Sequence, residues 1–349
     1  MVKKAALVSL SSGIIGEKRV EHELKIGLDR LEAMGIEVVP TENALAGLDY
    51  IREHPEKRAE DLLAAFADDT VDMILSAIGG DDTYRLLPYL FGNGELQRAV
   101  DNSRNRKIFL GFSDTTVNHL MLHKVGLPTF YGQSFLADIC ELEPTMLPYT
   151  EHYFRELVTT GRIAEIRPSD TWYEERPSFG VEDIGTLHAA HPNGGFELLQ
   201  GQPVFSGEIL GGCIDTLYDI FDNGRYADSV TVCRRYDLFP SLEDWRGRIL
   251  LLESSEEQMP PEKYRDALLK LKATGLFGVI SGILVGKPMN EVYHAEYKQL
   301  LCEVADDPSL PILCNVSIGH ALPRCIIPFG VPATVDAAEQ VIRFSWDKL

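Results

Sequence analysis

The sequence predicts an α/β fold with parallel β-sheets, divided into two domains, and three observations support this. First, a chain of 349 residues is longer than one hydrophobic core usually serves. Second, short apolar runs typical of buried strands alternate with segments of helical spacing. Third, polar residues directly follow several of these runs, where parallel sheets bind their ligands. We therefore expect helices on both sheet faces and a site at the carboxyl ends of the strands.

In the first half of the chain, apolar runs predict four strands and periodic segments predict four helices. The strands cover residues 5–10, 36–39, 71–78 and a run ending at 110, and the helices cover 21–34, 57–67, 83–90 and 115–124. Gly35 follows the first helical segment, as is common at a helix C-terminus. The run at 5–10 is too short for a secretory signal and is predicted to be the first strand.

The second half continues this alternation after an irregular stretch. Residues 159–183 lose all periodicity, which is typical of a linker or an active-site loop. The glycine-rich stretch 207–212 is interpreted as a turn-rich entry. Strands are then predicted at 248–252, 279–285, 311–316 and near 340–346, with helices at 213–221, 261–274 and 293–304. We predict an N-terminal domain over 1–158, a linker or active-site loop over 159–184 and a C-terminal domain over 185–349.

The charge balance excludes several classes of function. With 33 Lys and Arg against 53 Asp and Glu, the chain carries a formal charge of −20, which repels polyanions. We therefore expect no nucleic-acid partner and no membrane binding, because both depend on Lys and Arg contacts. No run approaches the ~20 apolar residues of a membrane span. Binding of a small anionic ligand is still compatible with this net charge if a local basic group or a helix terminus holds the ligand.

The cysteines indicate a reducing compartment. No two of them form a Cys-x-x-Cys pair, which argues against a zinc site. Several lie in apolar runs, where cysteine behaves as a small core residue. Free buried thiols fit the cytoplasm, which is the predicted location. The six cysteines are Cys140, Cys213, Cys233, Cys302, Cys314 and Cys325.

The segment 107–119 combines a strand end, a tight turn and the start of a helix. Ser113 lies in the turn, where its hydroxyl is expected to be exposed beside the unpaired first N–H groups of the helix. Those groups and the helix dipole suit an oxyanion that develops during acyl transfer. The alternative is that Ser113 only caps the helix. The choice depends on whether a base and an acid are present elsewhere.

Two further polar residues follow predicted strands in the second half. Glu253 comes directly after the apolar run 249–252, and His320 lies in the loop after 311–316. Taken singly, a solvated strand end explains Glu253, and a polar surface loop explains His320, better than a functional role does. Together with Ser113, however, they supply the hydroxyl, imidazole and carboxylate that serine acyl transfer needs. The order serine, acid, histidine is one that such triads use.

The turn Gly79-Gly80 has two candidate roles. A glycine turn that enters a helix can present N–H groups to a phosphate or to an oxyanion. Asp81 and Asp82 beside it would oppose a phosphate, although either could cap the following helix. The oxyanion role, or plain turn geometry, is therefore preferred to phosphate binding.

Four motifs, in this order along nearly the whole chain, resemble the landmarks of the S66 serine peptidases: Ala77-Ile-Gly-Gly-Asp-Asp-Thr-Tyr84, Gly111-Phe-Ser-Asp114, Leu250-Leu-Leu-Glu253 and Gly319-His320. The family contains the murein L,D-carboxypeptidases and the microcin C self-immunity proteins. The resemblance implies an N-terminal Rossmann-like (flavodoxin-like) domain and a C-terminal α/β domain of the swivelling β/α type, with the active site in the interdomain cleft. It also implies a homodimer that uses neither a metal nor another cofactor.

The resemblance also assigns roles to residues of this chain. Ser113 would be the nucleophile, His320 the general base and then the acid, and Glu253 the residue that orients His320. The backbone N–H of Asp114 would form the oxyanion hole together with an N–H of the Gly79-Gly80 turn.

The loop 169–175, with Trp172, and the segment 9–13 are similar to the microcin-immunity branch, in which a tryptophan stacks on the nucleobase. Trp172 could equally be an apolar plug that fastens its loop. This likeness favours a carboxypeptidase that cleaves the amide between the C-terminal carbonyl of a peptide or amino acid and a nucleotide-like group. A murein tetrapeptide L,D-carboxypeptidase that removes terminal D-alanine is the alternative.

Two other classes of function compete with this interpretation. Gly79-Gly80-Asp81-Asp82-Thr83 resembles the Gly-Gly-Asp-Gly-Thr loop of NAD kinases, but an aspartate replaces the glycine that lets a phosphate approach. That reading also leaves Glu253 and His320 without roles. A non-catalytic protein that sequesters its ligand in the cleft is the other possibility.

Overall fold

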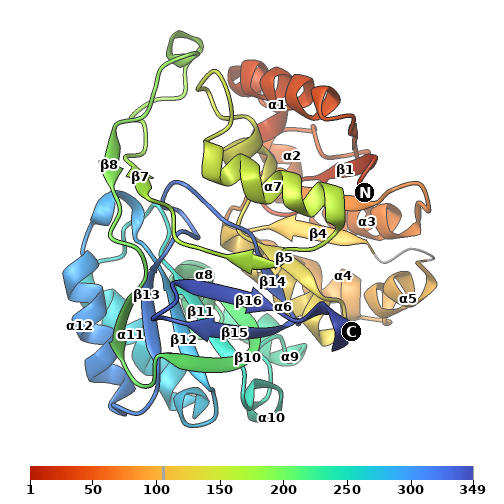
Figure 1. The fold of residues 1–349 in the computed structure, drawn as a ribbon. Helices are drawn as coiled ribbons and strands as arrows, with labels where there is room; N and C mark the ends of the chain where they lie inside the picture. The colour runs from red at the N-terminus through yellow and green to blue at the C-terminus, as the bar shows by residue number, and fades with distance from the viewer. Residues whose placement is uncertain (104–106, 349) are drawn as a thin grey trace.

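The computed structural model of the protein describes residues 1–103 and 107–348, and two β-sheets dominate it (Figure 1). The first is six-stranded, in the order β14-β5-β4-β3-β1-β2. Its strands are β1 Lys4–Val8, β2 Glu37–Pro40, β3 Met73–Ser76, β4 Ile108–Gly111, β5 Thr129–Tyr131 and β14 Ile327–Phe329. The five N-terminal strands are parallel, and β14 pairs antiparallel with β5. The predicted parallel sheet of the first half is therefore present.

Helices connect these strands in sequence. They are α1 Glu21–Ala33, α2 Leu48–Glu53, α3 Pro55–Ala67, α4 Leu87–Phe91, α5 Glu95–Asn102, α6 Thr116–Lys124 and α7 Pro148–Thr160. The predicted helices at 21–34, 57–67 and 115–124 correspond to α1, α3 and α6, and the one at 83–90 is a 3₁₀ turn over Thr83–Leu86 followed by α4.

The second sheet has eight strands in the order β6-β16-β15-β10-β11-β12-β13-β9. They are β6 Glu165–Ile166, β9 Glu197–Gln200, β10 Val204–Cys213, β11 Ile249–Glu253, β12 Gly282–Gly286, β13 Ile312–Val316, β15 Pro332–Asp336 and β16 Val341–Phe344. Only the four central strands, β10 to β13, run parallel. The outer strands pair antiparallel, so this half is a mixed sheet rather than a purely parallel one.

The helices of the second half are α8 Ile214–Asp219, α9 Ser229–Arg235, α10 Leu242–Trp245, α11 Pro261–Ala273 and α12 His294–Ala305. Helices α11 and α12 pack together, and the rings of Tyr264 and Tyr297 stack between them with centroids 4.0 Å apart. Within the described part of the chain, no helix has the length and apolar character that a membrane crossing needs.

The stretch 207–212, interpreted from its glycines as a turn, lies inside strand β10, and this corrects the prediction. Its last two glycines have φ of 137° and 138°, in the region that favours glycine. A Cβ atom at Gly211 would lie 2.2 Å from the carbonyl oxygen of Leu251, and one at Gly212 would lie 2.3 Å from Thr116 Oγ1. These glycines allow β10 to approach its neighbouring strand and helix α6, and they do not mark a turn.

The segment expected to be irregular, 159–183, contains short elements. Helix α7 ends inside it at Thr160, β6 joins the second sheet, and β7 Thr171–Tyr173 forms a small hairpin with β8 Ala190–Pro192. Figure 1 shows this segment crossing from α7 to the second sheet and projecting beyond the body of the molecule. The predicted domain boundaries stay predictions. Residues 327–329, assigned to the C-terminal domain, form β14 and pair with the first sheet, so the two sheets do not divide the chain at a single point.

Candidate active site

Ser113 lies two residues beyond β4 and opens the 3₁₀ turn Ser113–Thr115, which leads into α6. Its φ of 65° is in the left-handed region, which costs a non-glycine residue about 1–3 kcal/mol. The backbone N–H of Ser113 donates to the hydroxyl of Tyr131 over 3.2 Å. Strain of this kind at the end of a parallel strand is typical of a serine whose hydroxyl is held exposed above a sheet.

The three residues predicted to act together lie in one hydrogen-bonded chain. Ser113 Oγ is 3.0 Å from Nε2 of His320, and Nδ1 of the same ring is 2.7 Å from Glu253 Oε2. Glu253 is the last residue of β11, and His320 lies in the loop after β13. The carboxyl ends of β4 and β11 and the loop after β13 therefore lie side by side and bring these three side chains together.

Glu253 is 2 % exposed, and a tyrosine that the sequence did not single out binds its second oxygen. The hydroxyl of Tyr131 donates to Glu253 Oε1 over 2.6 Å. Burial opposes the charged form, but the charge and hydrogen bond of His320, together with the bond from Tyr131, hold the pKa of Glu253 below its usual value. The buried group is therefore a carboxylate with both oxygens occupied.

A second carboxylate contacts the histidine from the side of the serine. Glu256 Oε2 lies 3.1 Å from His320 Nε2, the atom that also faces Ser113 Oγ. Burial lowers the pKa of His320, but Glu253 and Glu256 outweigh it and raise the pKa to about 10. The two carboxylates therefore favour the protonated imidazole, in which both nitrogens donate.

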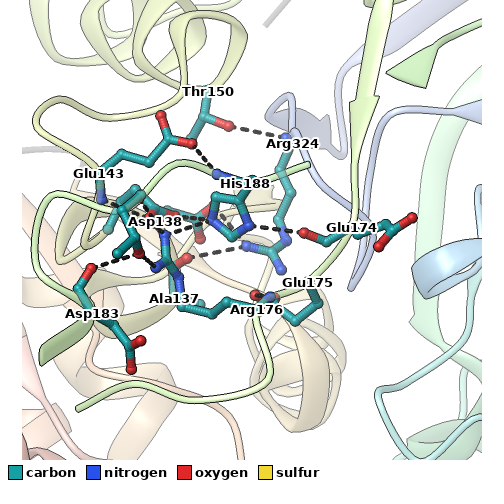
Figure 2. Close-up of polar contacts among 12 residues, drawn as sticks. Ala137, Asp138, Glu143, Thr150, Glu174, Glu175, Arg176, Asp183, His188 and Arg324 are labelled. Carbon is teal, nitrogen blue, oxygen red and sulfur yellow. Dashed lines mark hydrogen bonds and ion pairs between the residues drawn. The ribbon is translucent and has the colours of Figure 1, made fainter. Parts of the chain in front are cut away.

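Arg324 supports the histidine loop from behind, as Figure 2 shows in part. Its guanidinium donates to the carbonyl oxygens of Gly319 and, over 3.2 Å, His320, and it pairs with Asp138 at 3.0 Å. Its own backbone N–H donates to Thr150 Oγ1 over 3.0 Å. This buried arginine therefore fixes the backbone that carries His320.

A second polar network joins the loop after β7 to the segment before α7. Arg176 binds Glu141 at 2.6 Å, and His188 binds the other oxygen of Glu141 at 3.0 Å. Figure 2 shows Arg176 and His188 lying beside the Arg324 cluster. The loop is also bound to the site, because the N–H of Tyr173 donates to the carbonyl oxygen of Leu322 over 3.0 Å.

The glycine turn predicted to assist the oxyanion lies against the serine. A Cβ atom built on Gly79 would be 2.6 Å from Ser113 Cβ and 3.1 Å from the backbone N of Asp114. One on Gly80 would be 2.2 Å from Ser11 Oγ. The turn therefore packs so closely that neither position has room for a side chain. The N–H of Asp114 belongs to the first turn of a helix, where such groups lack an intrahelical partner.

The side chain of Asp114 fastens this turn. Its Oδ2 accepts hydrogen bonds from Ser11 Oγ at 2.7 Å and from the N–H and hydroxyl of Thr83 at 2.9 and 2.6 Å. Burial raises the pKa of this carboxyl group. Asp82, the residue that departs from the NAD-kinase loop, forms a buried ion pair with Arg58 at 2.5 Å. Its role is thus structural, and the loop presents acidic groups rather than a phosphate cradle.

Trp172 lies in β7, opposite His191 of β8, and is half-buried. Its ring is stacked on the imidazole of His191 with centroids 4.4 Å apart, and the ammonium of Lys287 is 5.1 Å from the ring centroid. A nucleobase would have to replace one of these neighbours or share the ring with them. A role for Trp172 in substrate binding stays a prediction.

One group of side chains in the described residues has the spacing of metal ligands. Donor atoms of Cys213, Glu253 and His320 all lie within 4.8 Å of one another. Glu253 and His320 are already bound to each other, which leaves Cys213 as the only member without such a partner in this group. That the protein works without a metal stays a prediction.

A two-domain α/β architecture with a serine, a histidine and a glutamate at facing strand ends defines a candidate hydrolase of the peptidase class. Comparison with protein families identifies it further. Residues 5–132 match the LD-carboxypeptidase N-terminal domain, and residues 206–335 match the LD-carboxypeptidase C-terminal domain. The chain belongs to the S66 peptidase family.

Individual relatives come from both branches of this family. A solved structure of an MccF-like protein from Streptococcus pneumoniae, in complex with AMP, is 59% identical with a TM-score of 0.97, over 99% of this chain and 100% of that one. The microcin C7 self-immunity protein MccF of Escherichia coli is 25% identical over 89% of this chain and 84% of its own length. A Bacillus subtilis protein designated a probable murein peptide carboxypeptidase is 26% identical over 89% and 83%. The family resemblance expected from the four motifs is confirmed.

Proposed function

We propose that this protein is a serine carboxypeptidase in which Ser113 is the nucleophile, His320 the base and Glu253 its orienting acid. The observation that carries the proposal is the continuous chain of hydrogen bonds, 3.0 Å from Ser113 Oγ to His320 Nε2 and 2.7 Å from Nδ1 to Glu253. This is the arrangement by which an imidazole takes the serine proton while a carboxylate stabilises the imidazolium.

The reaction proceeds in two halves. In the first, Ser113 Oγ attacks the scissile carbonyl, His320 takes the hydroxyl proton and then donates it to the departing amine. In the second, water attacks the acyl-enzyme while His320 takes its proton, and His320 then returns that proton to Ser113 Oγ as the bond to the acyl carbon breaks and the acid is released. The N–H of Asp114 and one from the Gly79-Gly80 turn bind the oxyanion in both halves, supported by the packing of that turn against Ser113.

The substrate class that the comparisons favour is an amide between a C-terminal carbonyl and a nucleotide-like group. The 59% identical structure contains AMP, and MccF, which shares the fold, has been solved with aspartyl sulfamoyl adenosine. Trp172 is the proposed platform for the base. The second candidate is a murein peptide. It is supported by the name of the B. subtilis relative, which is 26% identical to this chain, close to the 25% of E. coli MccF. The NAD-kinase alternative loses its support with the family assignment and the Asp82–Arg58 ion pair. Action in the cytoplasm as a homodimer belongs to the same proposal.

Hydrolysis assays on one preparation test both candidates. The protein is incubated with an aminoacyl sulfamoyl adenosine and with a murein tetrapeptide, and released products are measured by chromatography. Ser113→Ala and His320→Ala should each lower kcat by several orders of magnitude, with melting temperatures close to that of the native protein. Ser206→Ala and His152→Ala, at exposed positions, serve as controls.

Two outcomes contradict the proposal. Full activity of Ser113→Ala would show that another group is the nucleophile. Tight binding of the nucleotide amide without turnover, unchanged in Ser113→Ala, would instead favour the sequestering protein.

A further inference from the structure

Ser113 is held at two ends, and both contacts belong to one closed ring of hydrogen bonds. Its Oγ lies 3.0 Å from His320 Nε2, and its backbone N–H donates to the hydroxyl of Tyr131 over 3.2 Å. Tyr131 and His320 each bind one oxygen of Glu253, at 2.6 and 2.7 Å. The ring therefore leaves the serine through its backbone and returns to it through its side chain. Tyr131 is the one member of this ring that has no role in the proposed reaction.

The aromatic ring of Tyr131 is fixed by its packing. Tyr131 ends β5 and is completely buried. Its ring stacks on Phe329 of β14, with centroids 5.3 Å apart, and lies 5.2 Å from the ring of His119. Strand β10 is so close that a Cβ atom on Gly212 would lie 2.9 Å from Tyr131 Cε2. Because close packing leaves the ring no freedom to move, the two sheets set the position of its hydroxyl.

The direction of both hydrogen bonds of this hydroxyl is also fixed. Burial and the charge of Glu253 raise the pKa of Tyr131 well above its usual value, so the phenol keeps its proton. Its single O–H donates to the carboxylate, and its oxygen accepts the N–H of Ser113. The N–H of Ser113 is thereby directed away from an oxyanion. This leaves the oxyanion to the N–H of Asp114 and to the Gly79-Gly80 turn.

The two partners of the hydroxyl both need support. Ser113 has a φ of 65°, a conformation that a residue with a side chain keeps only when its surroundings hold it. Glu253 ends β11 of the second sheet, whereas Tyr131 belongs to the first, so their hydrogen bond joins the two sheets at the site. One hydroxyl thus holds the strained backbone of the serine and aligns the carboxylate with it.

We propose that Tyr131 is a positioning residue, whose hydroxyl fixes the backbone of Ser113 relative to the carboxylate of Glu253. Because Glu253 in turn holds His320, this hydroxyl sets the distance between the serine and the imidazole. The inference rests on the proposed function, which gives these residues their catalytic roles. Since Tyr131 is completely buried, it does not touch the substrate, and its loss should change the chemical steps and not substrate binding.

The test is Tyr131→Phe, which keeps the ring and its stacking and removes only the hydroxyl. We expect kcat for an aminoacyl sulfamoyl adenosine to fall by about 30- to 100-fold, as for a small misplacement of reacting groups, while KM changes by less than about twofold. Tyr153→Phe is the matched control, because Tyr153 is also buried and its hydroxyl also accepts a backbone N–H, that of Arg167 over 3.1 Å. It should keep the native kcat. All rates are measured where circular dichroism shows each variant folded.

A second readout needs no substrate turnover. An organofluorophosphonate reacts with an activated serine, and mass spectrometry gives the rate at which it labels Ser113. Tyr131→Phe should slow this labelling by a factor similar to its effect on kcat, and Tyr153→Phe should not slow it.

Three results would overturn the inference and leave the proposed function intact. They are a native kcat or labelling rate in folded Tyr131→Phe, a loss of kcat/KM that lies wholly in KM, and an equal loss of kcat in Tyr153→Phe. If the native protein neither hydrolyses the substrate nor is labelled at Ser113, the proposed function and the inference both fail.

Discussion

The contact between Glu256 and His320 makes the activity depend on pH in a way that one substitution changes. The base must be neutral to take the proton of Ser113, and Glu253 and Glu256 raise the pKa of His320 to about 10, which favours the protonated form at pH 7. Glu256→Gln removes a charge 3.1 Å from Nε2. Because the side chain of Glu256 is 64% exposed, the dielectric constant of water applies, which gives about 1.3 kcal/mol, or one pKa unit. The variant should therefore be about tenfold more active at pH 7.

The measurement is kcat/KM between pH 6 and 10.5 for the native protein, Glu256→Gln and Glu257→Gln. The rate of the native protein should rise with pH, and the profile of Glu256→Gln should be displaced by about one unit towards lower pH. Glu257→Gln is the control, since Glu257 binds Arg225 and not His320. A native profile already flat at pH 7, or a lower rate for Glu256→Gln across the range, would refute the idea that Glu256 holds the base protonated.

Further predictions concern the residues around the site. Gly79→Ala would place a Cβ atom 2.6 Å from that of Ser113 and so displace the nucleophile. We expect kcat to fall by about a hundredfold while circular dichroism shows a folded protein. An unchanged kcat would mean that the turn can move to make room. Tyr131→Phe deprives buried Glu253 of a 2.6 Å hydrogen bond and should lower the free energy of unfolding in urea by about 1–3 kcal/mol, so an unchanged midpoint contradicts this. Trp172→Ala should raise KM for nucleotide amides more than KM for a murein tetrapeptide. Equal increases in the two KM values would argue that Trp172 only fastens its loop.

The residues of the candidate site that the sequence predicted share one property. Glu253 directly follows an apolar run, and Ser113 and His320 lie in the turn or loop after two others, so their chain position alone places them near strand ends. Because parallel strands have the same polarity, each half presents its carboxyl strand ends at one edge of its own sheet. The packing of one sheet against the other leaves no trace in the sequence. The three residues, up to 207 apart in the chain, could be grouped only because a hydroxyl, an imidazole and a carboxylate form a catalytic triad and because the four motifs resemble the S66 family.

The supporting residues leave no comparable pattern. Tyr131 resembles any aromatic residue of a short strand, Arg324 precedes an apolar run, and Glu256 lies in a charged segment typical of a solvated loop. Their roles arise from tertiary contacts between segments that are far apart in the sequence. The glycines of β10 were wrongly predicted to form a turn, because close backbone approach within a strand and a turn both favour glycine. Of the outer antiparallel strands, the sequence predicted β16, near 340–346, whereas β9 and β15 are too short and too polar for their periodicity to be clear.

Strand β14 has a consequence for any attempt to divide this protein. It covers β5, whose remaining edge would otherwise expose unpaired N–H and C=O groups of Phe130 and its neighbours. A fragment that stops before residue 206 lacks this cover, and we expect it to self-associate through β5 when expressed alone. Strand β14 thus protects the edge of the first sheet, and we expect the first half to stay free of aggregation only when it folds as one molecule with the second.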